Sequence, residues 1–292
     1  MAFEGFQLSQ VETGEVSLRV RHGGSGPPIL LLHGYPETHM MWAKVAEGLA
    51  RDFTVVCPDL RGYGGSTKPP SSDDHETSSK RAMARDAIAV MRHFGFEQFD
   101  VAGHDRGGRV AYRLALDHPQ VVRRVSILDI IPTGEVWSRA NRRMALGYWH
   151  WSFLAQPYPM PETLIAPDPE YFLFKAQFRG AVTTFDADAY ADYVAAAKQP
   201  SVIHAMCEDY RAGAGYDRLL DEADKKAGRK IACPVQVLWG GKGALAAWYD
   251  TLAVWREWAD DVRGQPLDCG HFIPEEKPAE TLELLRGFFG EG

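Results

Sequence analysis

Short runs of apolar residues recur along the chain and alternate with segments whose apolar residues are spaced three or four apart. The runs at 28–32, 53–56, 99–102, 124–128 and 235–239 are rich in apolar and β-branched residues, as in strands buried on both faces of a sheet. The segments 80–94, 109–117 and 278–289 have the spacing of amphipathic helices. This alternation predicts an α/β fold with a mostly parallel central sheet flanked by helices.

The alternation stops between about residues 132 and 228, where the sequence becomes rich in aromatic residues, prolines and helical spacing. So many aromatic side chains need a surface to pack against or a pocket to line. We therefore predict a helical cap at residues 132–228, inserted into a core domain formed by residues 1–131 and 229–292. A run of surface helices packed on the sheet is the alternative interpretation.

Composition limits which binding partners and which cellular compartment are expected. The formal net charge is -7 and no run of Lys and Arg occurs, so neither nucleic acid nor an anionic membrane surface is expected as a partner. The start of the chain lacks the apolar core of a secretory signal, and the apolar run 27–32 is too short to span a bilayer. The 4 cysteines lie far apart without a Cys-x-x-Cys pair, which favours reduced thiols in the cytoplasm.

The turn between the strand 99–102 and the helix 109–117 carries the candidate chemistry. It reads Gly103-His104-Asp105-Arg106-Gly107, with glycines two positions away on both sides of a central aspartate. This is the pattern of the nucleophile elbow of α/β-hydrolases, in which the central side chain is lifted to the carboxyl edge of the sheet. Taken alone, the string also fits a simple turn whose aspartate caps the following helix.

The rest of a catalytic triad follows in the chain order nucleophile, acid, histidine that this fold requires. Asp129 ends the strand 124–128, and His271 follows the segment 262–267. The other position for the acid, at residues 240–244 after the strand 235–239, offers no carboxylate. We therefore predict Asp105 as nucleophile, Asp129 as acid and His271 as base, with Asp268 as a weaker candidate for the acid.

The loop after the first buried strand reads His33-Gly34-Tyr35-Pro36. His33 is expected to shape this loop and not to act as a base. The backbone N–H groups of Tyr35 and Arg106 are candidates for an oxyanion hole.

A carboxylate nucleophile suits the displacement of a leaving group from saturated carbon, which forms an ester between enzyme and substrate. His271 would then activate the water that hydrolyses this ester. Such chemistry needs no metal and no organic cofactor, and the sequence contains no ligand cluster or phosphate-binding loop. The expected reactants are a small organic substrate and water.

Two arginines beside the nucleophile indicate that this substrate is an anion. Arg106 and Arg109 are three residues apart at a helix start, next to Asp105. A substrate carboxylate that approaches ionised Asp105 would meet a repulsion of about 4 kcal/mol, which the two cations would offset. Surface charges, or partners of a nearby acid, are the alternative interpretation of the two arginines.

Further motifs carry a resemblance to a known family. They are the segments 33–39, 59–64 and 103–109, the pair His150-Trp151 and the triplet Asp209-Tyr210-Arg211. Over nearly its whole length the sequence resembles the haloacetate dehalogenases, α/β-hydrolases that include the fluoroacetate dehalogenases. The first two segments occur equally in epoxide hydrolases, whereas Arg106 and Arg109 with His150-Trp151 are more specific.

The resemblance implies hydrolysis of small 2-haloacids, such as fluoroacetate or chloroacetate, to glycolate and halide. It implies that Arg106 and Arg109 bind the substrate carboxylate, and that the cap residues His150, Trp151 and Tyr210 bind the departing halide. It also implies a homodimer.

Three alternatives remain open at this point. Other cap aromatics, Tyr148, Trp149 and Tyr216, compete for the halide contact. An epoxide hydrolase would use the same Asp105, Asp129 and His271, but a neutral epoxide has no need of the two arginines. A ligand-sensing module on a hydrolase fold would not need a complete triad.

Overall fold

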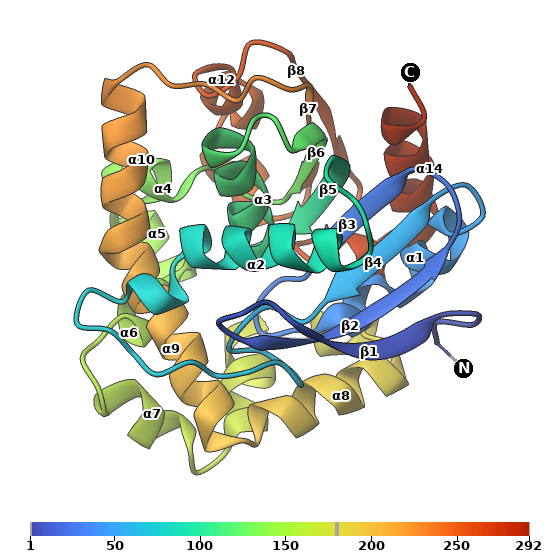
Figure 1. Ribbon diagram of the computed structural model, residues 1–292. Helices are drawn as coiled ribbons and strands as arrows, with labels where there is room; N and C mark the ends of the chain where they lie inside the picture. Colours follow the sequence, from blue (N-terminus) through green and yellow to red (C-terminus); the bar gives the residue numbers. More distant parts are fainter. Residues whose placement is uncertain (1, 179–180, 292) are drawn as a thin grey trace.

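The computed structural model describes residues 2–178 and 181–291. Its strands form an 8-stranded sheet in the order β1-β2-β4-β3-β5-β6-β7-β8 (Figure 1). β1, β2 and β4 pair antiparallel, and all neighbours from β4 through β3 to β8 pair in parallel. The strands are β1(Gln7–Glu12), β2(Ser17–Gly24), β3(Pro28–Leu32), β4(Thr54–Pro58), β5(Phe99–His104), β6(Val122–Leu128), β7(Val235–Gly240) and β8(Val262–Leu267). The expected mostly parallel sheet is confirmed.

The two antiparallel strands at the start of the chain were not among the expected elements. In β2, buried Leu18 and Val20 alternate with partly exposed Arg19 and Arg21. Such a half-exposed strand lacks the continuous apolar run that marks the central strands.

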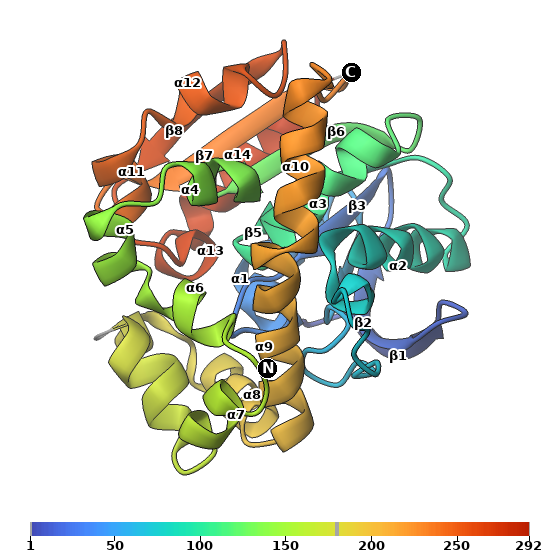
Figure 2. The same cartoon turned by 90° about the vertical axis from the view of Figure 1, so that its left-hand side faces the viewer.

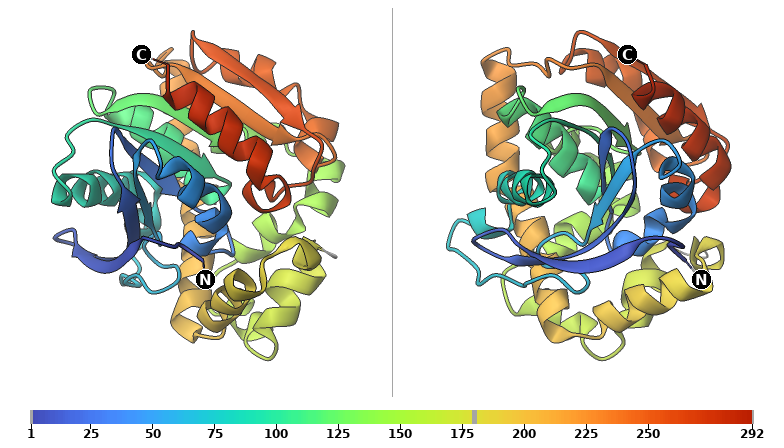
Figure 3. Two further views of the ribbon diagram at one scale, coloured as in Figure 1. Left: turned by 90° about the vertical axis from the view of Figure 1, so that its right-hand side faces the viewer. Right: turned by 45° about the vertical axis from the view of Figure 1, so that its right-hand side comes forward.

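Helices cover both faces of the sheet. On one face α1(Ala43–Leu49) packs beside α14(Pro278–Phe289), and on the other α2(Lys80–His93) packs beside α3(Arg106–Asp117) (Figure 3). The helical spacing at 80–94, 109–117 and 278–289 therefore predicted three of these four helices. The other helices outside residues 132–228 are short: η1(His39–Trp42), η2(Glu76–Ser78), α11(Ala244–Trp248), α12(Thr251–Arg256) and α13(Ile273–Glu276).

Every element that the structure describes between β6 and β7 is helical. In Figure 2 the helices α6 to α8 gather at one end of the molecule, whereas α9 and α10 run back along the core. We keep the word cap for residues 132–228, whose division from the core stays a prediction. Its helices are α4(Thr133–Ser138), α5(Arg142–Gly147), α6(Trp149–Leu154), α7(Met160–Ile165), η3(Tyr171–Ala176), η4(Ala181–Thr184), α8(Ala187–Ala197), α9(Pro200–Ala214) and α10(Tyr216–Lys226).

No helix within the described residues is both long and apolar enough to cross a membrane.

The register of the central strands brings their carboxyl ends to one edge. Leu32 of β3 pairs with Gly103 of β5, and the next residue, His104, pairs with Leu128 of β6. Leu128 in turn pairs with Leu238 of β7. The loops that leave these four strands therefore start side by side, which is where an open α/β sheet places its ligands.

Candidate active site

Asp105 lies at the tip of the turn between β5 and α3 and has the strained backbone of a nucleophile elbow, with φ 46° and ψ -113°. The flanking glycines are required by close packing: a Cβ on Gly103 would lie 2.3 Å from the carbonyl oxygen of Gly107. A Cβ on Gly107 would lie 2.4 Å from the carbonyl oxygen of Leu32. The carboxylate does not cap α3. It instead accepts a hydrogen bond on Oδ1 from the backbone N–H of Tyr35, at 3.0 Å.

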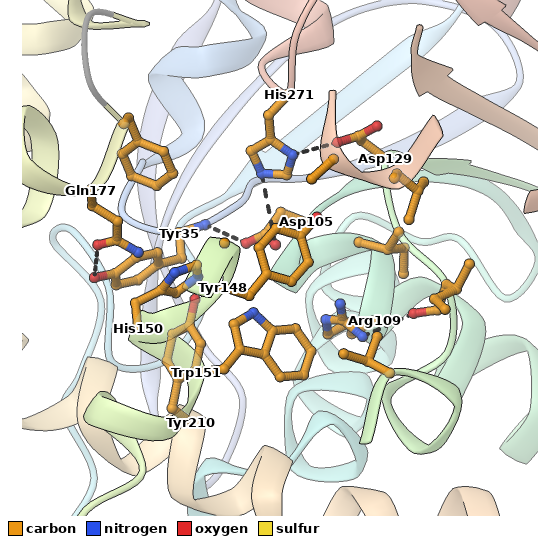
Figure 4. Close-up of a pocket in the computed structure, with 17 residues that line it drawn as sticks. Tyr35, Asp105, Arg109, Asp129, Tyr148, His150, Trp151, Gln177, Tyr210 and His271 are labelled. Atoms are coloured by element: carbon orange, nitrogen blue, oxygen red, sulfur yellow. Dashed lines mark hydrogen bonds and ion pairs between the residues drawn. The ribbon is translucent and has the colours of Figure 1, made fainter. Parts of the chain in front are cut away.

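The structure brings the three predicted triad residues together. His271 Nδ1 lies 2.6 Å from Asp129 Oδ2, and the backbone N–H of Gly240 donates to Asp129 Oδ1 at 2.8 Å. His271 Nε2 lies 3.9 Å from Asp105 Oδ2, which is longer than a hydrogen bond. The base therefore faces the nucleophile across an ion pair and not a hydrogen bond (Figure 4). The weaker candidate Asp268 is exposed and pairs with Lys242 at 2.8 Å.

Electrostatics set the protonation of this pair. Burial alone would raise the pKa of Asp105, but nearby positive charges, led by that of His271, outweigh it and lower the pKa to about 2. Burial alone would lower the pKa of His271, but the hydrogen bond to Asp129 and the charges of Asp129 and Asp105 raise it to about 9. At neutral pH the free enzyme therefore holds an ionised Asp105 opposite a protonated His271.

A cavity of about 130 Å³ opens over Asp105. Most of the predicted site residues line it, and Figure 4 shows them arranged around the nucleophile. The predicted residues on its wall are Tyr35, Asp105, Arg109, Asp129, His150, Trp151, Tyr210 and His271. A cavity of this size is small beside the pockets that bind drug-sized ligands.

The two arginines differ in their surroundings. Arg109 lines the cavity, and its Nη1 donates to the carbonyl oxygen of Ile131 at 3.0 Å and to Thr133 Oγ1 at 3.1 Å. Among the described residues no carboxylate lies within 4.0 Å of Arg109, and its Nε has no hydrogen-bond partner. Its charge is therefore available to an anion in the cavity.

Arg106 is not on the cavity wall but buried beneath it. Its Nε donates to Asp209 Oδ2 at 3.0 Å and its Nη2 donates to Asp209 Oδ1 at 2.7 Å. Asp209 also pairs with Lys80 and accepts from the hydroxyl of Tyr63 at 2.6 Å. Of the side-chain nitrogens of Arg106, only Nη1 lacks a hydrogen-bond partner among the described residues. The backbone N–H of Arg106 starts α3, where N–H groups have no acceptor within the helix.

The three cap residues predicted to bind a halide lie on one side of the cavity. The ring centroids of His150 and Tyr210 are 5.7 Å apart, and those of Trp151 and Tyr210 are 6.1 Å apart. Burial lowers the pKa of His150 to about 3, so its imidazole is neutral and carries a single N–H. Of the competing aromatics, Tyr148 lines the cavity, whereas Trp149 and Tyr216 are not on its wall.

Sequence reasoning missed Gln177 and Phe178 on the cavity wall. Both follow η3, a π-helical segment. Gln177 Oε1 accepts a hydrogen bond from the hydroxyl of Tyr35 at 3.0 Å, and Gln177 Nε2 has no partner among the described residues. The ring of Phe178 stacks on His271 at 6.5 Å. A π-helix has no recognised sequence signal, so only the folded chain places these side chains.

His33 plays the structural part expected of it. Its Nε2 accepts from the backbone N–H of Leu60 at 2.9 Å, and its Nδ1 contacts the carbonyl oxygen of Gly34 at 2.8 Å. The imidazole therefore ties together two loops behind the cavity.

Comparison with known families agrees with this geometry. A family model described as the alpha/beta hydrolase fold matches residues 27–278. The chain belongs to the α/β-hydrolase family. Within that family it is 44% identical over 292 residues to a fluoroacetate dehalogenase of a Burkholderia species, covering 99% of this chain and 95% of the relative. The sequence resemblance to the haloacetate dehalogenases is therefore confirmed.

Two further relatives come from the same family. A soluble epoxide hydrolase of Corynebacterium sp. strain C12 is 35% identical over 275 residues, which is 91% of each chain. A solved structure from Nostoc sp. PCC 7120, assigned to the α/β-hydrolases, superposes with a TM-score of 0.96 at 50% identity, covering 99% of this chain and 100% of that one. This α/β-hydrolase thus has a dehalogenase and an epoxide hydrolase among its relatives.

Proposed function

We propose that this α/β-hydrolase removes the halogen from small 2-haloacids, converting fluoroacetate or chloroacetate to glycolate and halide. The observation that carries the proposal is the pairing in one small cavity of an ionised nucleophile, Asp105, with Arg109, a cation that has no carboxylate within ion-pair distance among the described residues. Such a cavity accepts an anion with an electrophilic carbon. The 44% identity to a fluoroacetate dehalogenase supports the same conclusion.

In the first step, Asp105 displaces the halide. Oδ1 is held by the N–H of Tyr35, so Oδ2 is the oxygen that attacks the carbon bearing the halogen. The new C–O bond forms as the carbon–halogen bond breaks, and the halide leaves with the bonding electrons. The product is an ester of Asp105 with glycolate.

Cap donors stabilise the leaving halide. His150, Trp151 and Tyr210 each have an N–H or O–H group and line the same cavity. A well-placed donor of this kind typically lowers the barrier by about 3 kcal/mol. Fluoride concentrates its negative charge more than chloride, so it depends most on these donors.

In the second step, water hydrolyses the ester. Alkylation removes the charge of Asp105 that helps to keep His271 protonated, so His271 first gives its proton to solvent. Neutral His271 then takes a proton from a water that attacks Cγ of Asp105, while the N–H groups of Tyr35 and Arg106 hold the charge that develops on Oδ1. Glycolate leaves with the second proton of that water on its oxygen, and the carboxylate is restored. The proton taken by His271 restores its protonated form, so the overall products are glycolate, halide and the one proton released before hydrolysis. This route uses side chains, backbone N–H groups and water, and requires no metal or organic cofactor.

Arg109, on the cavity wall, is the proposed ligand of the substrate carboxylate, whereas a contact from Arg106, which does not line the cavity, stays a prediction from the sequence. Asp209 already balances the charge of Arg106, so Arg109 contributes most of the attraction. Release of halide from fluoroacetate and chloroacetate is the decisive assay. If neither acid yields halide, the proposed function is wrong.

Epoxide hydrolysis is the second candidate, favoured by two tyrosines, Tyr148 and Tyr210, on the cavity wall. Paired phenols could protonate the oxygen of an opening epoxide. Rapid turnover of styrene oxide without haloacetate activity would reverse the ranking. A protein that only senses ligands would show neither activity. A cytoplasmic location and a homodimer remain predictions from the sequence.

A further inference from the structure

Behind the catalytic histidine lies a buried group of polar side chains that the proposed reaction does not use. Glu37 and His104 are 0% exposed and Glu275 is 6% exposed. Glu37 follows β3, His104 ends β5, and Glu275 lies in α13, the helix just after His271. None of the three lines the cavity over Asp105.

The hydrogen bonds of His104 define which of its nitrogens carries a proton. His104 Nε2 lies 2.8 Å from the backbone carbonyl oxygen of His271. A carbonyl oxygen only accepts, so Nε2 must donate. In a neutral imidazole, Nδ1 is then an acceptor. Its neighbour, at 3.3 Å, is Glu37 Oε2.

If His104 and Glu37 were charged and formed an ion pair, each would lie beside a further group of the same charge. The ring of His104 is 4.6 Å from the ring of His271, so an imidazolium at His104 would lie against a second cation. The carboxyl of Glu37 contacts that of Glu275, so a carboxylate there would face another acid. The 3.3 Å separation is also longer than a charge-assisted hydrogen bond. Burial is the leading cause that lowers the pKa of His104 to about 4 and raises that of Glu37 to about 7.

The two carboxyls can satisfy each other only if one of them carries a proton, and Glu37 needs a proton of its own to donate to His104 Nδ1. Glu37 Oε1 and Glu275 Oε2 have no donor among the described residues, although the two carboxyl groups are in contact. Glu275 Oε1 accepts from the hydroxyl of Tyr193 in α8 at 3.1 Å. A proton on Glu275 Oε2 would supply the missing donor to Glu37 Oε1.

We propose that Glu37 and Glu275 are both neutral and form a one-directional chain of hydrogen bonds from Tyr193 to the backbone carbonyl of His271. Tyr193 donates to Glu275, Glu275 to Glu37, Glu37 to His104 Nδ1, and His104 Nε2 to the His271 carbonyl. Glu37 is thus a positioning residue: it fixes the His104 tautomer that holds the catalytic histidine.

The close packing at Gly34 is consistent with Glu37 and His104 being held in one arrangement. A Cβ at this position would lie 2.7 Å from Glu37 Oε2, 2.7 Å from His104 Nδ1 and 2.9 Å from Asp105 Cβ. The backbone of Gly34 therefore packs directly against both the chain of hydrogen bonds and the nucleophile.

If the proposed function holds, loss of this chain of hydrogen bonds should slow only the second of the two steps, ester hydrolysis. Asp105 alkylation does not use His271 as a base, whereas ester hydrolysis does. A displacement of His271 by a fraction of an ångström slows hydrolysis by about 10-fold or more. The ester then accumulates.

Glutamine is the discriminating substitution because its amide has the shape and the donor of a protonated glutamate. We expect Glu37→Gln to hydrolyse the ester within about threefold of the native rate, and Glu37→Met, which lacks a donor, to be slower by about 10-fold or more. Rapid quenching and mass spectrometry of the alkylated protein separate the two steps. If Glu37→Gln is as slow as Glu37→Met, or if Glu37→Met hydrolyses the ester normally, the proposal is wrong.

A second measurement does not depend on activity or on a folded Met variant. In ¹⁵N spectra of the unsubstituted protein near neutral pH, His104 should be neutral, with a proton on Nε2 and none on Nδ1. An imidazolium, or a proton on Nδ1, overturns the proposal even if the protein releases halide. Conversely, a protein with the expected tautomer that releases no halide would refute the proposed function alone.

Discussion

Replacement of Arg109 by methionine tests whether this arginine makes the cavity selective for anions. Arg109→Met keeps most of the side-chain volume and removes the charge. The guanidinium lies 4.5 Å from the ring centroid of Trp151, and no carboxylate within the described part of the chain lies within ion-pair distance of it. Its loss therefore strips the cavity of a positive charge that can attract a substrate carboxylate.

The magnitude follows from the separation of the charges. A substrate carboxylate about 4 Å from the guanidinium gains about 4 kcal/mol at an effective dielectric constant of about 20. A hydrogen bond to a charged group contributes about 1.5–3 kcal/mol when measured by mutation. Taking a loss of about 2 to 4 kcal/mol, we expect kcat/KM for chloroacetate to fall by about 30-fold to 1,000-fold.

The assay compares chloroacetate with its neutral analogue chloroacetamide, by halide release and by the mass of the alkylated protein. Arg109→Met should lose activity on chloroacetate but keep its activity on chloroacetamide within about threefold of the native value. The reason is that the amide carries no charge for Arg109 to attract. Arg109→Lys keeps the charge and should lose less than Arg109→Met.

Thermal unfolding controls for stability, since the carbonyl oxygen of Ile131 loses the donor Nη1 of Arg109. An unpaired buried acceptor costs about 1–3 kcal/mol. Equal losses for the two substrates, or no loss for chloroacetate, would refute the assignment of Arg109 to the substrate carboxylate.

The remaining predictions concern the nucleophile, the base and one glycine. Asp105→Asn should lower halide release by more than about 1,000-fold with an unchanged melting temperature; normal turnover would remove Asp105 from its role. In the free enzyme, burial opposes but does not prevent the rise of the pKa of His271 to about 9, to which the charge of Asp105 contributes. The ester removes that charge, so the pKa should fall below 9 in the intermediate. Because only neutral imidazole accepts a proton, ester decay should slow as the pH falls through the pKa of His271 in the intermediate. A flat profile between about pH 5 and 9 would contradict this. Gly34→Ala should cost about 1–3 kcal/mol in the free energy of unfolding. The control Gly287→Ala in α14, where a Cβ meets nothing within 4 Å, should be neutral or stabilising by up to about 1 kcal/mol; equal melting temperatures would refute the packing argument.

Much of the fold follows from local pattern. The central strands and helices α2, α3 and α14 were predicted within a few residues because burial on both faces, or on one helical stripe, leaves a periodic signal. β1 and β2 were missed because half-exposed strands beside the main parallel sheet lack that signal. The triad was predictable because the fold fixes its order along the chain and places each member just after a strand.

Side-chain partners were not predictable in the same way. Arg106 and Arg109 look equivalent in the sequence, three residues apart on one helix. Only the folded chain brings Asp209, about a hundred positions later, onto Arg106 and leaves Arg109 to the cavity. Gln177 likewise reaches the cavity through a π-helical segment that has no local sequence signal.

The sequence by itself thus determined the sheet, the elbow with its aspartate, the order of the triad and the anionic character expected of the substrate. These features depend on neighbours along the chain or on rules that hold for the whole fold. The tertiary structure alone decided which arginine is free, which aromatics share the cavity and which carboxyls face each other behind His271. Those outcomes depend on contacts between distant segments, and burial together with the neighbouring charges and hydrogen bonds then sets the protonation of each group.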